Sequence, residues 1–286
     1  MRAACHGQAS EAIVPPSLTG GTTMTQYACL EVAVADGVGR LTLHRPPLNA
    51  LTPAMMAEVA EAAAQLDRDA GVRVLLLDAS GNAFSAGGDM AFLAELNRKP
   101  PFDIKSTLYA SFAAGVKAVK LAQKPVVAAV NGAAVGAGCE LALAADFRVG
   151  STRAMFQQSW INIGCISPLG GLFLLPRLVG LAKASEMMLL GSKVQAEEAL
   201  RIGLLNELVA PADLPAAALA LARRLAAGPP LALRAMKESL RRALETTIAG
   251  EWEHNVYVQS MLLSSEDFGE GVAALRENRT PRYQGR

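Results

Sequence analysis

Two glycine-containing turns are the segments of this sequence best suited to chemistry. The first turn, Ala83–Asp89 (AFSAGGD), follows the apolar run Val72–Leu77, and the second, Asn131–Cys139, follows the run Val126–Val130. Small residues at a strand-to-helix turn let a ligand approach the backbone closely. The second turn also opens a predicted helix, whose first N–H groups have no partners within the helix and carry partial positive charge. Such a place suits an oxyanion that develops during a reaction.

Each turn by itself has a second explanation, because tight packing between a helix and a strand also selects small residues. Neither turn matches a phosphate-binding fingerprint. A Gly-Lys-Ser/Thr motif is missing, and Gly136 and Gly138 are followed by Leu141 where a dinucleotide-binding motif has its third glycine.

Glu140 is the acidic residue nearest to the second turn. It stands in the first turn of a nearly all-apolar predicted helix, Cys139–Ala145, three residues after Ala137, so the two residues share about one face of that helix. One interpretation is a first-turn acid that the helix dipole stabilises. The other is a carboxylate that exchanges protons with a substrate carbon or with water beside the oxyanion site.

The elements around these turns alternate between strands and helices. Residues 28–44 predict a hairpin, Thr52-Pro53 predicts the start of a helix, and short apolar strands follow at 72–77, 126–130 and 147–149. This alternation is typical of βαβ units and predicts an α/β fold. Further helices are expected at 103–122, 195–202, 212–226, 231–249, 251–263 and 266–277, with one short strand at 204–209.

The composition limits the class of protein. Of the 286 residues, 51% are hydrophobic and 19% charged, which is enough apolar material for a sizeable core. The net charge is +1, from 27 Lys and Arg against 26 Asp and Glu, so we expect no nucleic-acid partner. The cysteines and histidines have none of the spacings of a metal site, so we also expect no metal.

Two segments bear on membranes and targeting. Residues 154–176 carry no charged side chain, but their glutamines, glycines and Pro168 argue against a bilayer span. We therefore expect a buried loop and strand there and no membrane partner. Residues 1–23 are interpreted as a flexible tail without the apolar stretch of a secretory signal, and the protein is expected to be cytoplasmic.

Four segments, taken in their order and spacing, resemble the enoyl-CoA hydratase/isomerase (crotonase) superfamily. They are His44–Leu51 (HRPPLNAL), Ala83–Asp89, Asn131–Asp146 and Pro168–Gly180, and the resemblance runs from about residue 27 to residue 284. It implies an α/β fold with a crotonase-like spiral of ββα units over residues 24–225. It also implies a C-terminal helical region over residues 226–286 that builds trimers, which usually pair into hexamers.

The resemblance implies a site for acyl-CoA thioesters. In the family, two backbone N–H groups hold the thioester oxygen as it becomes enolate-like, and the matching positions here are Ala86 and Ala137. Glu140 matches the first of the hydratases' two catalytic glutamates. No cofactor is expected, because coenzyme A is part of the substrate. The implied substrate-binding positions are Arg45, which lies where the family often has a basic residue near the nucleotide, and Ala86, Gly87, Asp89, Gly136 and Trp160.

The sequence departs from the hydratase pattern at one position. The family places a second glutamate 20 residues after the first, and here that position is Trp160. Related isomerases use an acid there or about eight residues later, where this chain has Pro168. Adding water to a conjugated thioester needs one group to activate water and one to protonate the α-carbon, so Glu140 alone is expected to support ordinary hydration poorly.

Two classes of function remain open from the sequence. The first is an enoyl-CoA hydratase-like lyase, or alternatively an enoyl-CoA isomerase, with Glu140 as the only retained acid–base group. The second is a non-catalytic protein of the same fold that binds acyl-CoA or RNA. A serine hydrolase of a related fold is disfavoured because the chain has no GxSxG motif. Arg45 and Asp89 also have structural interpretations, as an exposed surface arginine and as a helix cap.

Overall fold

The computed structural model describes residues 27–286, so the expected tail at residues 1–23 lies outside the described residues. Its larger sheet has six strands in the order β1-β2-β3-β5-β7-β10. Only β1 and β2 pair antiparallel, and every other neighbouring pair is parallel. The strands are β1 (Leu30–Ala35), β2 (Val38–Leu43), β3 (Val74–Ala79), β5 (Val126–Val130), β7 (Phe147–Ser151) and β10 (Glu207–Val209).

The hairpin predicted at residues 28–44 is present. Asp36 and Gly37 connect its strands, and both have positive φ angles, 52° and 75°. A two-residue turn of this kind matches the twist of antiparallel strands, which fixes the register that pairs Leu30 with Leu43.

A second sheet of four short strands supports the candidate site. Its order is β4 (Ala83–Ser85), β6 (Ala133–Val135), β8 (Met155–Gln157) and β9 (Lys193–Gln195). The first three strands run parallel, whereas β9 runs antiparallel to β8. Each strand has only three residues, which is too short for an alternating pattern in the sequence to reveal it.

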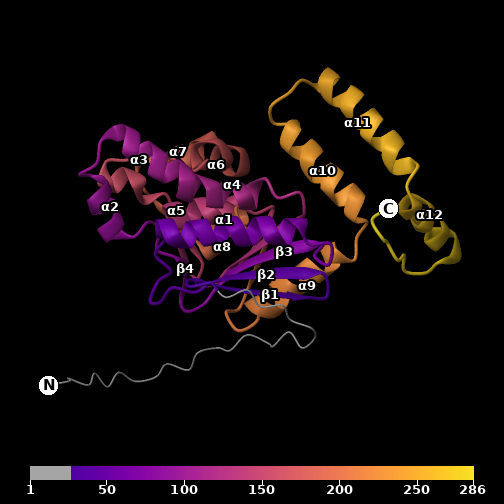
Figure 1. The fold of residues 1–286 in the computed structure, drawn as a ribbon, viewed down its shortest axis with the longest axis horizontal. Coiled ribbons are helices and arrows are strands. Elements are labelled where there is room, and N and C mark those ends of the chain that lie inside the picture. Colours follow the sequence, from indigo (N-terminus) through magenta and orange to yellow (C-terminus); the bar gives the residue numbers. More distant parts are fainter. Residues whose placement is uncertain (1–26) are drawn as a thin grey trace.

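Helices cover both faces of the six-stranded sheet (Figure 1). Leu75 and Leu77 of β3 belong to the core shared with α1 (Pro53–Arg68), α4 (Ala114–Lys120) and α5 (Ala137–Ala144). Val74 and Leu76 point the other way and pack against α9 (Leu214–Ala226). A strand covered on both faces must be apolar throughout, which explains the unbroken apolar run in β3.

Most of the helices that the sequence predicts for the core are present in the structure. The helix expected at 103–122 is present as α3 (Pro101–Leu108), a π-helical turn (Tyr109–Ala113) and α4. The prediction of a loop and strand at residues 154–176 is partly wrong. Strand β8 and a 3₁₀ turn (Ser159–Ile163) lie in this segment, but a helix begins at residue 171. The other helices of the core are α2 (Met90–Leu96), α6 (Gly171–Val179), α7 (Leu181–Leu189) and α8 (Ala196–Arg201).

The C-terminal helices form an arm that projects from the core (Figure 1). The arm consists of α10 (Pro230–Arg242), α11 (Ile248–Leu263) and α12 (Glu266–Glu277). The helix expected at 231–249 is too long, because α10 ends at Arg242 and Thr247 caps a new helix by accepting a hydrogen bond from Gly250 N–H. Within residues 27–286, no helix combines the length and the apolar character that a membrane crossing requires.

Gly138 lets α5 approach β4 closely, and this contact yields a test of the fold. A Cβ atom at residue 138 would lie 2.6 Å from Ser85 Cβ and 2.8 Å from its carbonyl oxygen. We expect Gly138→Ala to lower the free energy of unfolding by about 1–3 kcal/mol through overpacking, despite the higher helix propensity of alanine. In α12, a Cβ at Gly269 meets nothing within 4 Å, so Gly269→Ala is the matched control.

The measurement is urea denaturation of both variants and the wild type at equal protein concentration. The control should gain up to about 1 kcal/mol from helix propensity alone. A stabilised Gly138→Ala variant would show that α5 does not depend on this close approach.

Candidate active site

Three parallel strands of the small sheet end at the same edge and place the candidate residues there. The chain leaves β4 into Ala86–Asp89, leaves β6 into Gly136 and Ala137, and leaves β8 toward Trp160. Ligands commonly bind at the carboxyl ends of parallel strands, because the loops that follow the strands meet at that edge. The structure therefore brings together residues that are up to 74 positions apart in the sequence, which is 160 − 86.

The turn after β4 and the turn after β6 contact each other at Gly87. Gly87 has a φ of +92°, and a Cβ at this position would lie 2.6 Å from the carbonyl oxygen of Val135 and 3.7 Å from the nitrogen of Ala137. Gly136 has a φ of +51°. Side chains at these two positions would either clash or strain the backbone, so both glycines shape the site rather than contribute chemical groups.

The N–H of Ala86 is not available to a ligand in this structure. It donates a hydrogen bond to the carbonyl oxygen of Leu48 at 2.9 Å, and Gly87 N–H donates to Ser85 Oγ at 3.1 Å. The expectation that Ala86 lends its N–H to an oxyanion therefore conflicts with the hydrogen bond that this group already makes. The reason is that the chain after β4 continues to pair with the loop that contains Leu48.

Gly88 offers the N–H that Ala86 does not. Leu51 N–H donates to the carbonyl of Gly87 at 2.7 Å, and Asp89 N–H donates to the carbonyl of Leu51 at 2.9 Å. Leu51 and Gly88 therefore form a parallel bridge, in which Leu51 bonds to the residues before and after Gly88. In such a bridge the N–H of Gly88 itself points away from Leu51. Among residues 27–286 it has no hydrogen-bond partner. Gly88 is not among the site residues predicted from the sequence, although its place directly before a helix-capping aspartate is a usable signal.

Ala137 supplies a second N–H without a partner. It is the first residue of α5, so its N–H cannot bond within the helix, and no other acceptor meets it in the described part of the chain. Gly87 directly precedes Gly88, and a Cβ at Gly87 would lie 3.7 Å from the nitrogen of Ala137. Two N–H groups without partners in the described part of the chain, those of Gly88 and Ala137, thus belong to two turns that touch at the start of α5.

Glu140 is fully buried one helical turn after Ala137. Its Oε1 accepts hydrogen bonds from Ser167 Oγ (2.7 Å), Leu169 N–H (2.8 Å) and Gly171 N–H (2.9 Å). Its Oε2 accepts one from Trp160 Nε1–H at 3.0 Å. All four groups donate, so the surroundings suit a carboxylate, and Oε2 keeps acceptor capacity for one more proton or donor.

Burial raises the pKa of Glu140 above its ordinary value of 4.5, and the hydrogen bonds from Ser167, Gly171, Leu169 and Trp160 oppose that rise. Desolvation disfavours the charged form, whereas each donor favours it. A raised pKa brings a carboxyl group nearer to neutral pH, where it can both accept and return a proton.

Trp160 stands at the position where hydratases of the family have their second glutamate. Here it contacts Glu140, which matches the first glutamate. Its indole N–H donates to Glu140, and its ring lies against Gly136, with Cε2 3.6 Å from where a Cβ would stand. The side chain is half-buried. Trp160 is thus a hydrogen-bond donor to Glu140 and an apolar wall beside Gly136.

Arg45 and Asp89 pair with each other. Arg45 Nη2 lies 3.0 Å from Asp89 Oδ2, and Arg45 Nη1 donates to the carbonyl of Ala50 at 2.9 Å. Asp89 also caps α2 by accepting hydrogen bonds from Ala91 N–H and Phe92 N–H, and the bond from Phe92 is the main reason that its pKa is lowered. The pair ties the loop after β2 to the turn that contains Gly88, so the capping interpretation of Asp89 is confirmed.

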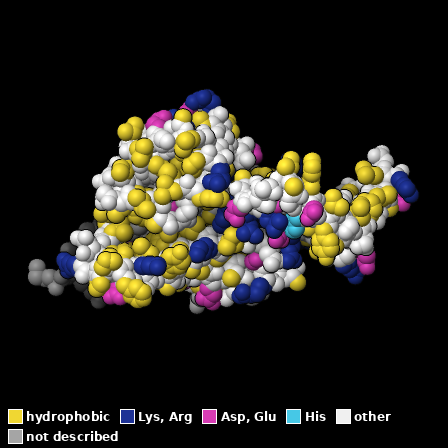
Figure 2. Space-filling view, turned by 90° about the horizontal axis from the view of Figure 1, so that it is seen from above, with side chains coloured by type: hydrophobic (Ala, Val, Ile, Leu, Met, Phe, Trp, Pro, Cys, Tyr) yellow, Lys and Arg dark blue, Asp and Glu magenta, His cyan; other side chains and the backbone are white. Residues whose placement is uncertain are grey.

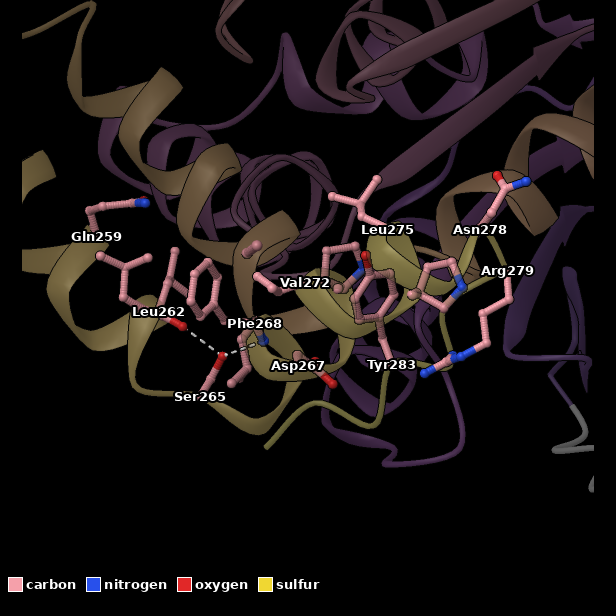
Figure 3. Close-up of a pocket in the computed structure, with 17 residues that line it drawn as sticks. Gln259, Leu262, Ser265, Asp267, Phe268, Val272, Leu275, Asn278, Arg279 and Tyr283 are labelled. Atoms are coloured by element: carbon pink, nitrogen blue, oxygen red, sulfur yellow. Dashed lines mark hydrogen bonds between the residues drawn. The ribbon is translucent and has the colours of Figure 1, made fainter.

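A separate cavity of about 460 Å³ lies in the C-terminal arm and contains none of these residues (Figure 3). Ser265 beside it donates to the carbonyl of Leu262 and accepts from Phe268 N–H, which are bonds of a helix start. In the described part of the chain, no group of three or more His, Cys, Asp or Glu residues is arranged to hold a metal ion.

The protein is thus a layered α/β protein, and its candidate site lies at the carboxyl ends of three parallel strands. A family model for enoyl-CoA hydratase/isomerase matches residues 33–286. The chain belongs to this family, and the crotonase-type fold expected from the resemblance is confirmed.

Individual relatives agree with this assignment. The chain is 36% identical over 261 residues to a Rhodobacter capsulatus protein named "Probable enoyl-CoA hydratase", which covers 91% of this chain and 99% of the relative. It is 34% identical over 254 residues to the 1,2-epoxyphenylacetyl-CoA isomerase of Escherichia coli, with 88% and 97% covered. The crystal structure of an enoyl-CoA hydratase from Polaromonas sp. JS666 superimposes with a TM-score of 0.85 at 31% identity, with 89% and 99% covered.

The raised pKa of Glu140 predicts how stability depends on pH. The folded protein keeps this proton to a higher pH than the unfolded chain does, so it binds more protons above pH 4.5. The free energy of unfolding of the wild type should therefore fall, relative to that of Glu140→Gln, as the pH rises from 4.5 toward the pKa of the folded state. Above that pKa the difference should stay constant.

Urea denaturation of both proteins between about pH 4 and pH 8, at one protein concentration, measures this difference. A difference that grows in favour of the wild type as the pH rises toward 4.5, and stays constant above it, would mean that the four hydrogen bonds outweigh burial and lower the pKa.

Proposed function

We propose that this protein processes acyl-CoA thioesters by stabilising an enolate-like oxyanion, with Glu140 as the only acid–base group. The observation that carries the proposal is the placement of one buried carboxyl group a single helical turn after Ala137, whose N–H has no partner among residues 27–286. The family membership supports acyl-CoA as the substrate class.

The proposed oxyanion site uses Ala137 N–H as the sequence predicts, with Gly88 N–H in the place of Ala86 N–H. The neighbouring backbone groups of both turns are hydrogen-bonded, so the two N–H groups need little reorganisation when charge develops on a thioester oxygen. The start of α5 adds the positive end of the helix dipole. Gly87 and Gly136 keep side chains out of the space that the thioester would occupy.

A single carboxyl group favours some reactions over others. Removing a proton from one carbon and returning it to another needs one group that accepts and then donates. Hydration needs a second group to activate water, and Trp160 has no proton-accepting atom. The proposal is therefore double-bond migration, or another enolate reaction of an acyl-CoA, ahead of ordinary hydration. The hydratase-type lyase remains the alternative for a substrate that is already activated.

The contacts with coenzyme A are proposed on the same side as the strand ends. Arg45 and Asp89 join the loop after β2 to the Gly88 turn, and Arg45 is half-buried with its guanidinium beside that turn. Coenzyme A enters as part of the substrate, and the proposal needs no further cofactor. A non-catalytic acyl-CoA-binding protein would keep these contacts but would not need a carboxyl group of raised pKa.

Assembly into a homotrimer or homohexamer is proposed for the C-terminal arm. Large apolar side chains are exposed along it, and Figure 2 shows hydrophobic surface on the arm where it projects from the core. Examples are Leu240 (64%), Ile248 (72%), Trp252 (67%), Val256 (70%) and Leu275 (84%). Exposed apolar surface of this extent is typical of interfaces between subunits.

The first prediction of this proposal concerns Trp160. The wild type should hydrate crotonyl-CoA poorly, and Trp160→Glu should raise the rate, because a second acid–base group contributes about 10²–10⁴-fold. The measurement is the loss of the enoyl-thioester absorbance, after circular dichroism has shown that the variant is folded. Trp160→Ala is the matched control, because it opens the same space without adding a carboxylate.

Rapid hydration by the wild type would contradict the single-carboxylate account. An equal gain in Trp160→Ala would show that space, rather than the missing carboxylate, limits the reaction.

The second prediction concerns assembly. We expect light scattering at micromolar concentration to give the mass of three or six chains, and Leu240→Glu to shift the protein toward smaller species, because it places a charge in the apolar face. A monomeric wild type would contradict the proposed role of the arm.

A further inference from the structure

A cavity of about 660 Å³ lies beside the loop that holds Glu140. Helices α3 and α4 line one side of it, and the loop Pro168–Gly170 with the start of α6 lines another. In Figure 1 these helices lie over the same end of the core. Most of the lining is apolar, including Leu108, Val116 and Phe173.

The cavity begins next to the proposed reaction centre. Leu169 is one of the residues that line it, and the N–H of the same residue donates to Glu140 Oε1 at 2.8 Å. An acyl chain whose α- and β-carbons lie beside Glu140 can therefore continue into this space. A volume of this size is within the range of ligand-binding pockets.

Lys120 is the unusual member of the lining. It is half-buried, and among residues 27–286 no carboxylate lies within ion-pair distance of its ammonium group. Asp146 is the acid whose charge acts on it, but Asp146 Oδ2 is already paired with Lys237 Nζ at 2.7 Å. The positive charges of Lys237, Arg148 and Arg241 also act on Lys120.

The other charged residues of the lining leave the balance positive. Lys105, Lys117 and Arg241 are exposed at the rim, and Glu245 is the one acidic residue among those that line the cavity. Lys117 Nζ lies over the ring of Tyr109, 4.7 Å from its centre, and so has a partner of its own. Lys120 also lines an adjoining cavity of about 470 Å³, to which Asp146, Arg148 and Lys237 belong. It thus lies between two cavities, half-buried and without an ion-pair partner among residues 27–286.

A neutral acyl chain in this cavity would displace water from Lys120 and leave a buried, unpaired charge, which is costly. An anionic group at the far end of the chain would instead form a charge-assisted hydrogen bond with it. The apolar walls suit the methylene groups between the two ends of such a chain.

We propose that the cavity beside Glu140 binds acyl groups that end in a carboxylate, and that Lys120 recognises this terminal carboxylate. The substrate class is then the coenzyme A thioesters of dicarboxylic acids, with the thioester at the oxyanion site and the free carboxylate at Lys120. This inference rests on the proposed acyl-CoA function and adds the choice of acyl group.

Binding of saturated thioesters tests the inference without requiring any reaction. Adipoyl-, suberoyl- and sebacoyl-CoA are compared by isothermal titration calorimetry with hexanoyl-, octanoyl- and decanoyl-CoA, which match them in carbon number and lack the terminal carboxylate. We expect at least one length at which the carboxylate-ended compound binds about tenfold or more tightly than its neutral partner. The best length then reports the distance between the two ends of the site.

Three variants identify the group responsible. Lys120→Met should abolish most of the preference, and Lys120→Arg should keep it because the charge is retained. Lys193→Met is the control for net charge, because Lys193 is exposed on β9 and lies outside the cavity lining. The preference should survive in this control.

The outcomes separate the inference from the function on which it rests. If neither series binds, the proposed acyl-CoA function fails, and the inference fails with it. If both series bind equally at every length, or if the preference persists in folded Lys120→Met, the acyl-CoA function stands and the inference is overturned. The comparison of the two series in the wild type decides even if Lys120→Met does not fold.

Discussion

The burial of one carboxyl group with four hydrogen-bond donors is the constraint on which the site depends. Glu140 lies in the first turn of an apolar helix, where an ionised group without partners would be too costly to keep. Ser167, Leu169 and Gly171 from one loop, and Trp160 from another, satisfy it. A Cβ at Gly171 would lie only 2.2 Å from Ser167 Oγ, so that loop is shaped around the carboxylate. The same contacts that make its burial possible fix the orientation of its remaining acceptor.

Tryptophan at position 160, in place of the glutamate of the hydratase pattern, changes which groups can transfer protons at the site. An acid at this position would repel the first carboxylate and would share protons with it, whereas an indole N–H can only donate. The donor fixes Glu140 Oε2 and adds an apolar wall beside Gly136. Under the proposed function, such a site can stabilise an enolate and move one proton, but it lacks the second group on which ordinary hydration depends.

Much of this arrangement could be predicted from the sequence. The longer strands and helices can be recognised in the sequence. Strands such as Val126–Val130 are apolar throughout, and helices such as α12 begin at a clear capping residue. The three-residue strands of the small sheet were not, because their pairing is decided by contacts far away in the sequence. The same limit explains the error at Ala86: which N–H in the turn remains without a partner depends on the pairing of Leu48 and Leu51 with that turn.

The exchange of α-protons tests the central claim, that Glu140 moves a proton at a carbon activated by the oxyanion site. Butyryl-CoA is incubated with the protein in D₂O, and proton NMR follows the loss of the α-hydrogens. We expect exchange by the wild type and a loss of about 10²–10⁴-fold in folded Glu140→Gln. Exchange at the same rate in both proteins, or none in the wild type, would contradict it.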